Sequence, residues 1–294
     1  EQRRVLAERS EWLAEDGADI QRSYERAVQL DLLMARARLA MSQSWHIPTL
    51  SSSGELNIRG AANPVLALRG IEVVRNDIVL DPETAFIIVS GPNTGGKTVT
   101  LGTLGLLVAM TQAAIPIPAE ASSVIAVVDG IHAIFGDAQD LQKDLSTFSG
   151  HLVELQKALD MAKPNHLILL DEIAVGTDPE LGACLAIAVL EALSERGARG
   201  MVTTHYPTLK TLGLRDDRFT NASVGMDEET LKPNYKLSFG TYGSSNPLMI
   251  AEQLGFDTSV LARARTLSSG DEGLSLALSR LQAQQRTLEL AIEK

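Results

Sequence analysis

Two short segments of the chain contain residue types that could hold a phosphate group and activate a water molecule. In the first, residues 86–98 read FIIVSGPNTGGKT, in which a glycine-rich turn precedes Lys97 and Thr98. Glycines let backbone N–H groups approach phosphate oxygens, the lysine adds positive charge toward the β- and γ-phosphates, and the hydroxyl can bind Mg²⁺. The spacing from Gly91 to Gly96 therefore predicts a phosphate-binding loop.

The surroundings of this loop support that prediction. Residues 85–89 have the apolar composition of a strand, and residues 97–114 have that of an apolar helix. A phosphate-binding loop joins a strand to a helix, whereas a glycine-rich turn with a chance GKT needs no such neighbours. The flanking elements therefore favour phosphate binding over a chance match.

The second segment is an unbroken apolar run at residues 166–170 that ends in Asp171 and Glu172. Such a run is typical of a central parallel strand that is covered on both faces. The first carboxylate can hold Mg²⁺, usually through water, and the second can polarise an attacking water. The alternative, a surface acidic pair after a buried strand, is disfavoured beside a phosphate-binding loop. The glutamate also favours hydrolysis over phosphoryl transfer to a specific acceptor.

His205 follows the next predicted strand, residues 200–204, within the sequence TTHYP. The carboxyl ends of parallel strands meet where α/β proteins bind nucleotides, so we expect His205 to contact the γ-phosphate or to orient the water. The other four histidines lack this context, and their spacing does not resemble a metal site. They are His46, His132, His151 and His166.

Residues 146–149, which read STFS, are rich in hydroxyl side chains and precede a predicted helix. A helix N-terminus with free N–H groups can bind an anion, but hydroxyl residues there also serve as simple N-caps. The residues alone favour capping at Ser146.

The elements that position these residues follow a β-α-β pattern. A helix is predicted from Pro179 to about residue 196, between the strands that precede Glu172 and His205. Short strand-like runs surround this unit, and those before the loop are expected to form an antiparallel edge beside the nucleotide. The runs lie within residues 57–80, notably at 71–74 and 78–80, and at 124–128, 131–135, 221–226 and 235–239. Further helices are expected at 152–161, 247–254 and 258–267. The pattern predicts an α/β fold.

The two ends of the chain have helical composition. Residues 1–45 are rich in Ala, Leu, Glu, Arg and Gln and contain no proline, which predicts two helices separated near Gly17. Residues 46–54 resemble a linker or turn. From residue 268 the leucine spacing could begin a coiled coil, although an ordinary amphipathic helix is commoner. We therefore expect a helical segment at 1–50, an α/β domain at 51–267 and a C-terminal helix at 268–294.

Composition limits the classes of protein. The chain has 294 residues, 45% hydrophobic and 21% charged, which is ordinary for a globular protein. A formal net charge of -11 argues against a broad basic surface for nucleic acid. Cys184 is the only cysteine, which excludes an intrachain disulfide and fits a reducing cytoplasm. With no apolar run long enough for a bilayer and no signal peptide, we expect a cytoplasmic protein without a membrane partner, and a fragment of a longer chain.

In combination these motifs resemble the ATPase region of the MutS family, most closely its second bacterial type. The resemblance covers residues 54–267 and rests on SGPNTGGKTVTLGTLGLL, PIPAE, DLSTFSGHL, LLDEIAVGTDP and TTHYPTLK. Two sites depart from the family. Ala62, Asn63 and Pro64 replace a basic-His-Pro element, which puts a nucleotide contact there in doubt, and Ala174 and Val175 replace glycine and alanine. We expect altered loop flexibility at the second site without loss of activity.

The resemblance implies a P-loop NTPase with an ABC-type ATPase fold, acting as a homodimer with two composite sites for ATP or ADP. It implies catalytic roles for Glu172, Lys97 and His205, and Mg²⁺ binding by Thr98 and Asp171. Ser146 would complete the site of the opposite subunit, and residues 176–178 would lie near the dimer contact. The nucleotide-binding residues that it implies are Gly91, Pro92, Asn93, Thr94, Gly95, Gly96, Lys97, Thr98 and Val99.

For the whole protein, the resemblance implies a motor whose nucleotide state moves helical arms and acts on branched DNA, suppressing homologous recombination, or on stalled ribosomes. Any nuclease activity would lie in a C-terminal domain outside these residues. One alternative is an ABC transporter or chromosome-maintenance ATPase, and STFSG in place of an LSGGQ-type signature argues against it. Another is a nucleotide-gated binding module of mismatch-repair type with little turnover, and the intact Asp171 and Glu172 argue against it.

Overall fold

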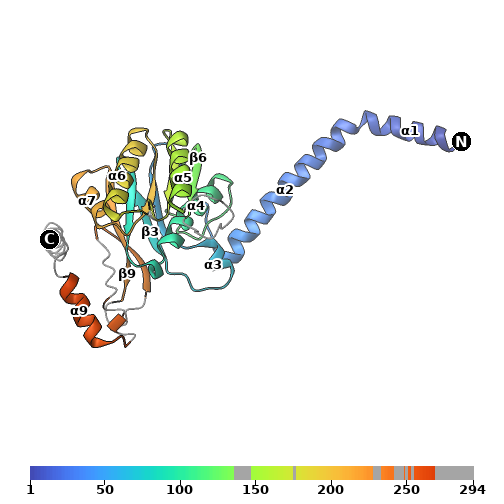
Figure 1. The fold of residues 1–294 in the computed structure, drawn as a ribbon. Coiled ribbons are helices and arrows are strands. Elements are labelled where there is room, and N and C mark those ends of the chain that lie inside the picture. Colours follow the sequence, from blue (N-terminus) through green and yellow to red (C-terminus); the bar gives the residue numbers. More distant parts are fainter. Residues whose placement is uncertain are drawn as a thin grey trace.

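The body of the protein is an α/β structure with two sheets, and a long helical arm leads away from it (Figure 1). The computed structural model describes residues 1–135, 147–174, 177–227, 233–241, 248, 251–252 and 255–268. Among these residues, no helix has the length and apolar character needed to cross a membrane.

The larger sheet has six strands within the described residues, in the order β10-β9-β4-β8-β7-β6. All neighbouring strands are parallel except β10, which pairs antiparallel with β9. The strands are β4 (Phe86–Ser90), β6 (Gly130–Ile134), β7 (His166–Leu170), β8 (Arg199–Thr203), β9 (Phe219–Met226) and β10 (Pro233–Phe239). The expected β-α-β unit is confirmed, and β4, β7 and β8 end at the same edge.

Helices cover both faces of this sheet, as the apolar strand sequences predict. In β4, Phe86 and Ile88 pack into one core with α5 (Thr147–Met161), α6 (Pro179–Glu195) and α7 (Pro207–Arg215). Ile87 and Val89 pack into the opposite core with α4 (Lys97–Gln112) and the smaller sheet. Every residue of β4 is buried, so the strand holds the loop that follows it from both sides.

The smaller sheet has four strands in the described part of the chain, in the order β1-β5-β2-β3. They are β1 (Thr49–Ser51), β5 (Val124–Ala126), β2 (Leu56–Ala61) and β3 (Asn76–Leu80). β1 lies in the segment expected to be a linker, but it pairs with β5. The expected strand at residues 71–74 is wrong, because pairing begins only at Asn76 and residues 71–75 belong to no strand.

The side chains of Arg199 and Asn76 connect the two sheets. The half-buried guanidinium of Arg199, on β8, donates to the backbone oxygens of Gly54, Leu80, Asp81 and Thr84. The Asn76 side chain donates to the Tyr235 backbone oxygen at 2.9 Å and accepts from the Leu237 N–H at 2.8 Å. These contacts hold β3 beside β8 and β10.

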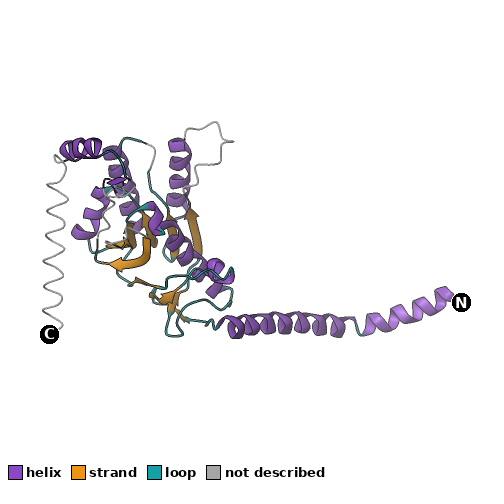
Figure 2. Ribbon diagram, turned by 90° about the horizontal axis from the view of Figure 1, so that it is seen from below, coloured by secondary structure: helices purple, strands orange, loops and turns teal. Residues whose placement is uncertain are grey.

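The arm consists of α1 (Gln2–Glu15) and α2 (Gly17–Gln43), with the expected break near Gly17. Figures 1 and 2 show both helices extending away from the body toward the N-terminus. Arg36 of α2 donates to the Ala113 oxygen at 2.7 Å, which joins the arm to the end of α4. Large apolar side chains on the arm are exposed, including Leu6, Trp12, Leu13, Ile20, Tyr24, Val28, Leu32, Leu33 and Met41.

Besides β1, the sequence did not predict α3 (Pro64–Leu68), the 3-10 turn η1 (Asn93–Gly95) or α7. α9 (Thr258–Ser268) agrees with the helix expected at 258–267. Most of the helix expected at 247–254 and the leucine-rich tail beyond residue 268 lie outside the described residues.

Candidate functional site

The glycine-rich loop follows β4 and ends at the first residue of α4. Gly96 caps that helix with φ 91° and Gly91 has φ 130°, both in the left-handed region that favours glycine. A Cβ atom on Gly91 would lie 2.6 Å from the Val224 oxygen of β9. The loop therefore needs glycine at both positions, and its backbone N–H groups stand at the N-terminus of a sixteen-residue helix.

Lys97 is almost completely buried, with 2% of its surface exposed. Its Nζ donates to the Gly91 oxygen at 2.7 Å and lies 3.0 Å from Nε2 of His205. Burial lowers the pKa of the Lys97 ammonium to about 8, although the negative charges of Glu172 and Asp171 oppose that shift. Because the charged form is poorly solvated there, an anion placed beside Nζ would stabilise it.

Thr98 and Asp171 meet beside this lysine. The Thr98 hydroxyl donates to Oδ2 of Asp171 at 2.7 Å, and Asp171 is 5% exposed. Two hard oxygen atoms suit Mg²⁺, which usually takes one or two protein ligands and completes its shell with phosphate and water. Within the described residues, no group of three or more His, Cys, Asp and Glu side chains could hold a metal. The donor set therefore fits a Mg²⁺ ion that arrives with a nucleotide.

Glu172 and His205 lie at the mouth of the site. Oε1 of Glu172 is 3.1 Å from Nε2 of His205, and the two side chains are 28% and 37% exposed. The same His205 nitrogen lies near both Lys97 and Glu172, so it stands between the ammonium and the carboxylate. The structure thus brings together the carboxylate and histidine that the sequence suggested from separate strands.

Thr203 is a site residue that sequence reasoning missed. It is the last residue of β8 and is fully buried, and its hydroxyl donates to Oδ1 of Asp171. The oxygen of that hydroxyl also accepts from the backbone N–H of Glu172 at 2.8 Å. One feature of the sequence could have indicated this role. Thr203 is a hydroxyl residue near the end of a predicted strand, and that strand is expected to run parallel to the strand that ends before Asp171.

The loop after Glu172 contains one of the two departures from the family pattern. Ala174 has φ 59°, a left-handed conformation, which explains why glycine would suit this position. Its oxygen accepts from the Tyr206 hydroxyl at 2.8 Å. Val175 and Gly176 lie outside the described residues, so the expected change in loop flexibility stays a prediction.

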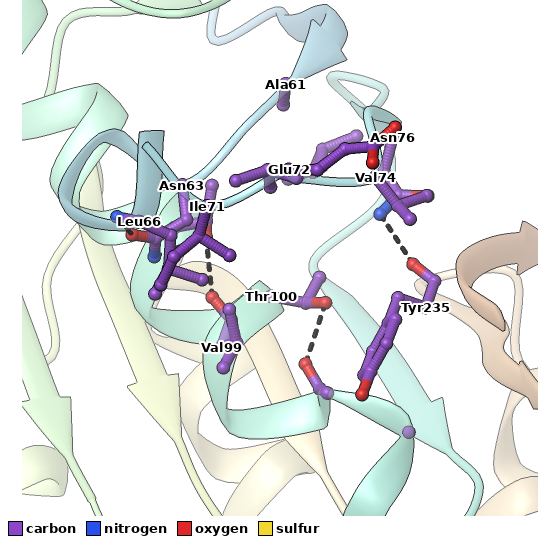
Figure 3. Close-up of a pocket in the computed structure, with 15 residues that line it drawn as sticks. Ala61, Asn63, Leu66, Ile71, Glu72, Val74, Asn76, Val99, Thr100 and Tyr235 are labelled. Carbon is purple, nitrogen blue, oxygen red and sulfur yellow. Dashed lines mark hydrogen bonds between the residues drawn. The ribbon is translucent and has the colours of Figure 1, made fainter. Parts of the chain in front are cut away.

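An apolar pocket of about 330 Å³ opens beside the glycine-rich loop (Figure 3). It lies where α3, α4 and β3 face Tyr235 of β10, and that tyrosine is 49% exposed. Asn63 belongs to residues 62–64, the other segment that departs from the family pattern. It caps α3 and donates to the Thr103 hydroxyl at 3.0 Å. The lining residues include Leu66, Ile71, Val73, Val74, Ile78, Gly95, Gly96, Val99, Thr100 and Tyr235. Sequence reasoning missed this pocket.

The remaining expected site residues differ in their exposure to solvent. Pro92 and Gly95 are buried in the loop, whereas Thr94, Thr98 and Val99 are exposed at its surface. Asn93 begins η1. Ser146 lies outside the described residues, so its expected role across a dimer stays a prediction.

Residues 87–270 match the family described as MutS domain V. The chain is 41% identical over 269 residues to a protein of Halothermothrix orenii named "Endonuclease MutS2", with 92% of this chain and 34% of that protein covered. The protein of that name from Listeria monocytogenes is 42% identical, with 90% of this chain and 33% of that protein covered. The one from Levilactobacillus brevis is 41% identical, with 100% of this chain and 37% of that protein covered. The chain therefore spans about a third of the length of these relatives. With the loop, the strand-end carboxylates and the histidine in one place, it belongs to the MutS family, in the MutS2 branch, and carries that family's ATPase domain.

Proposed function

We propose that this domain binds ATP with Mg²⁺ and hydrolyses it at Glu172. The observation that carries the proposal is the convergence of Lys97, Glu172 and His205 within hydrogen-bond distance beside the glycine-rich loop. Loop amides and a buried ammonium suit the phosphates, and a neighbouring carboxylate suits a water molecule.

In the proposed reaction, the loop N–H groups and Lys97 hold the β- and γ-phosphates. Thr98 and Asp171 would hold Mg²⁺, which neutralises charge on the phosphate oxygens. Glu172 accepts a proton from the water that attacks the γ-phosphorus, the bond from that phosphorus to the bridging oxygen breaks, and ADP and phosphate leave. His205 contacts the γ-phosphate, while its present contact with Glu172 keeps that carboxylate oriented.

The apolar pocket is the proposed place of the nucleoside. It borders Gly95, Gly96 and Val99, so a nucleotide with its phosphates in the loop would direct its base toward Tyr235. Pockets of this volume with apolar walls and few polar groups are typical of small-molecule sites. The assignment of adenine rests on the family.

We also propose, from the family resemblance, that the domain has the ABC-type fold and works as a homodimer. Ser146 of one subunit would complete the site of the other. Mixing Ser146→Ala subunits with Lys97→Ala subunits leaves one intact composite site in each mixed dimer, so part of the activity should return. No recovery at saturating dimer concentration would contradict the shared site.

For the whole protein we propose that nucleotide state moves the arm and thereby acts on branched DNA or on stalled ribosomes. The exposed apolar side chains along α1 and α2 support a role for the arm in contacts with other segments. Isolating the full-length Glu172→Gln protein in its ATP state and identifying the bound DNA or ribosomes would test this part.

The test of the enzymatic proposal is steady-state phosphate release. Glu172→Gln removes the proton acceptor while it keeps the shape of the side chain, and a general base contributes roughly 100-fold or more to a rate. We expect a loss of about that size, with ATP binding retained. Glu8→Gln, on the exposed surface of α1, is the matched control. Equal slow rates in all three proteins would instead support a binding module with little turnover.

A further inference from the structure

We propose that Thr203 is a positioning residue that fixes Asp171 and Glu172 together for metal binding and hydrolysis. This inference rests on the proposed ATPase function and adds to it a side chain from a different strand. No motif of the phosphate-binding loop or of the strand-end acidic pair contains this residue.

The direction of each hydrogen bond at Thr203 follows from the groups involved. The Glu172 N–H can only donate, so Oγ1 of Thr203 accepts at 2.8 Å. The ionised Asp171 carboxylate can only accept, so the Thr203 hydroxyl hydrogen points to Oδ1. The result is a directed chain from the Glu172 amide through the Thr203 hydroxyl to the Asp171 carboxylate.

This series of hydrogen bonds determines which oxygen of Asp171 faces the metal position. Thr203 engages Oδ1, while Oδ2 lies 2.7 Å from the Thr98 hydroxyl. Hydrogen bonds from neighbouring groups commonly orient metal ligands in this way. With Oδ1 held, Oδ2 remains directed toward Thr98, its partner in the proposed Mg²⁺ site.

Thr203 also holds the backbone of Glu172. Glu172 has φ 51°, a left-handed conformation that a non-glycine residue adopts only at a cost. Its N–H lies beyond the last residue of β7, Leu170, and is held by the Thr203 hydroxyl. That contact stabilises the conformation in which Oε1 of Glu172 reaches His205.

The contact between Thr203 and Asp171 is shielded from solvent, so no water can replace the hydroxyl without rearrangement. Thr203 is 0% exposed, and its partner Asp171 is 5% exposed. Thr203→Val keeps the shape of the side chain but removes both hydrogen bonds, which leaves the Glu172 N–H and the Asp171 oxygen unpaired. Thr203→Ser restores the hydroxyl. Thr111→Val is the matched control, because Thr111 is also buried but its hydroxyl donates to the Leu107 oxygen within α4.

The experiment measures two quantities in these variants and in the wild type: the Mg²⁺ concentration that half-saturates binding of a fluorescent ATP analogue, and kcat for phosphate release. Loss of a residue that orients a metal ligand typically weakens metal binding by about 10- to 100-fold. We therefore expect Thr203→Val to raise the Mg²⁺ requirement and lower kcat each by about tenfold or more, with Mg²⁺-independent binding retained. Thr203→Ser and Thr111→Val should stay within about threefold of wild type.

Two outcomes would overturn the inference: wild-type Mg²⁺ dependence and kcat in folded Thr203→Val, or equal impairment in Thr203→Ser and Thr203→Val. If Thr203→Val does not fold, Thr203→Ala takes its place in the comparison with Thr203→Ser. A wild type that binds the analogue but releases no phosphate would contradict the proposed function alone, because the Mg²⁺ titration still decides the role of Thr203.

Discussion

The two ends of the candidate nucleotide site are built differently. At the phosphate end, Lys97, Asp171 and Thr203 are buried, and each is hydrogen-bonded to another part of the site. At the other end, the pocket beside Tyr235 is open and its walls are largely apolar. The phosphate end thus resembles a pre-organised reaction centre, whereas the pocket resembles a surface that supplies affinity.

This difference suggests that the two ends of the site have different functions. Changes at the phosphate end should alter catalysis or the binding of charge, and changes in the pocket should alter nucleotide affinity without altering kcat.

Lys97→Met should have the largest effect on binding. Loss of a charged hydrogen-bond donor to phosphate costs about 1.5–3 kcal/mol, so nucleotide affinity should fall by roughly 10- to 100-fold. Methionine avoids the cost of burying an ammonium, so the nucleotide-free variant should be at least as stable as wild type. Calorimetric binding and urea unfolding measure the two effects. A destabilised variant would contradict the view that Lys97 serves the ligand.

Nucleotide affinity should fall as pH rises above 8. The pKa of Lys97 is lowered to about 8 by burial, and bound phosphates favour the charged form, so binding takes up a proton at higher pH. Affinity should fall about tenfold between pH 7 and pH 9. Titrations across this range test it, and Lys97→Met should lack this dependence.

The stability of the nucleotide-free protein should change in the opposite direction. Between pH 8 and 10.5, the ordinary pKa of a lysine side chain, the unfolded chain holds the Lys97 proton that the folded chain has lost. The contribution of Lys97 to the free energy of unfolding therefore rises by up to about 1.4 kcal/mol per pH unit in this window. Comparing the unfolding free energies of wild type and Lys97→Met cancels the other titrating groups. No difference between their pH profiles would contradict the assigned cause.

Tyr235→Ala should weaken nucleotide binding without lowering kcat at saturation. Stacking of a base on an aromatic ring contributes about 1–3 kcal/mol, and the half-exposed ring favours the lower limit, which is roughly fivefold in affinity. Tyr235→Phe keeps the ring and is the control. An equal loss in both variants would assign the effect to the hydroxyl and contradict stacking.

Asn76→Ala should have the smallest effect. It removes two hydrogen bonds between the pocket wall and β10, and each contributes about 1 kcal/mol to stability. We expect an unfolding free energy lower by about 1–2 kcal/mol and a KM about threefold higher, with kcat unchanged. A fall in kcat would show that the pocket wall also positions the phosphate end.

The same contrast explains how much of the site could be predicted from sequence. Phosphate binding needs glycines that bring backbone N–H groups close and a lysine that adds charge, so Gly91, Gly96 and Lys97 form a recognisable pattern. The walls of an apolar pocket, in contrast, need only bulky side chains of low polarity. Ile71 to Val74 have the composition of a strand, but in the structure they line the pocket. Strand propensity mainly reflects half-burial against neighbours, which a pocket wall also provides.

Thr203 was missed for another reason. Its relation to Asp171 depends on the parallel register of β7 and β8, where Leu170 pairs with Val202 and the next residues stand side by side. The sequence predicts both strands and the residues at their ends, including Glu172 and His205. It does not contain the register that makes an ordinary buried threonine a partner of the carboxylate.

The central claim is that the phosphate end performs catalysis while the pocket supplies affinity. The most direct test measures kcat and the dissociation constant for ATP in wild type, Glu172→Gln and Tyr235→Ala. Glu172→Gln should lower kcat by about 100-fold or more with affinity within about threefold, and Tyr235→Ala should lower affinity roughly fivefold with kcat unchanged. If Glu172→Gln keeps the wild-type kcat, or if both variants lower the same quantity, the claim is contradicted.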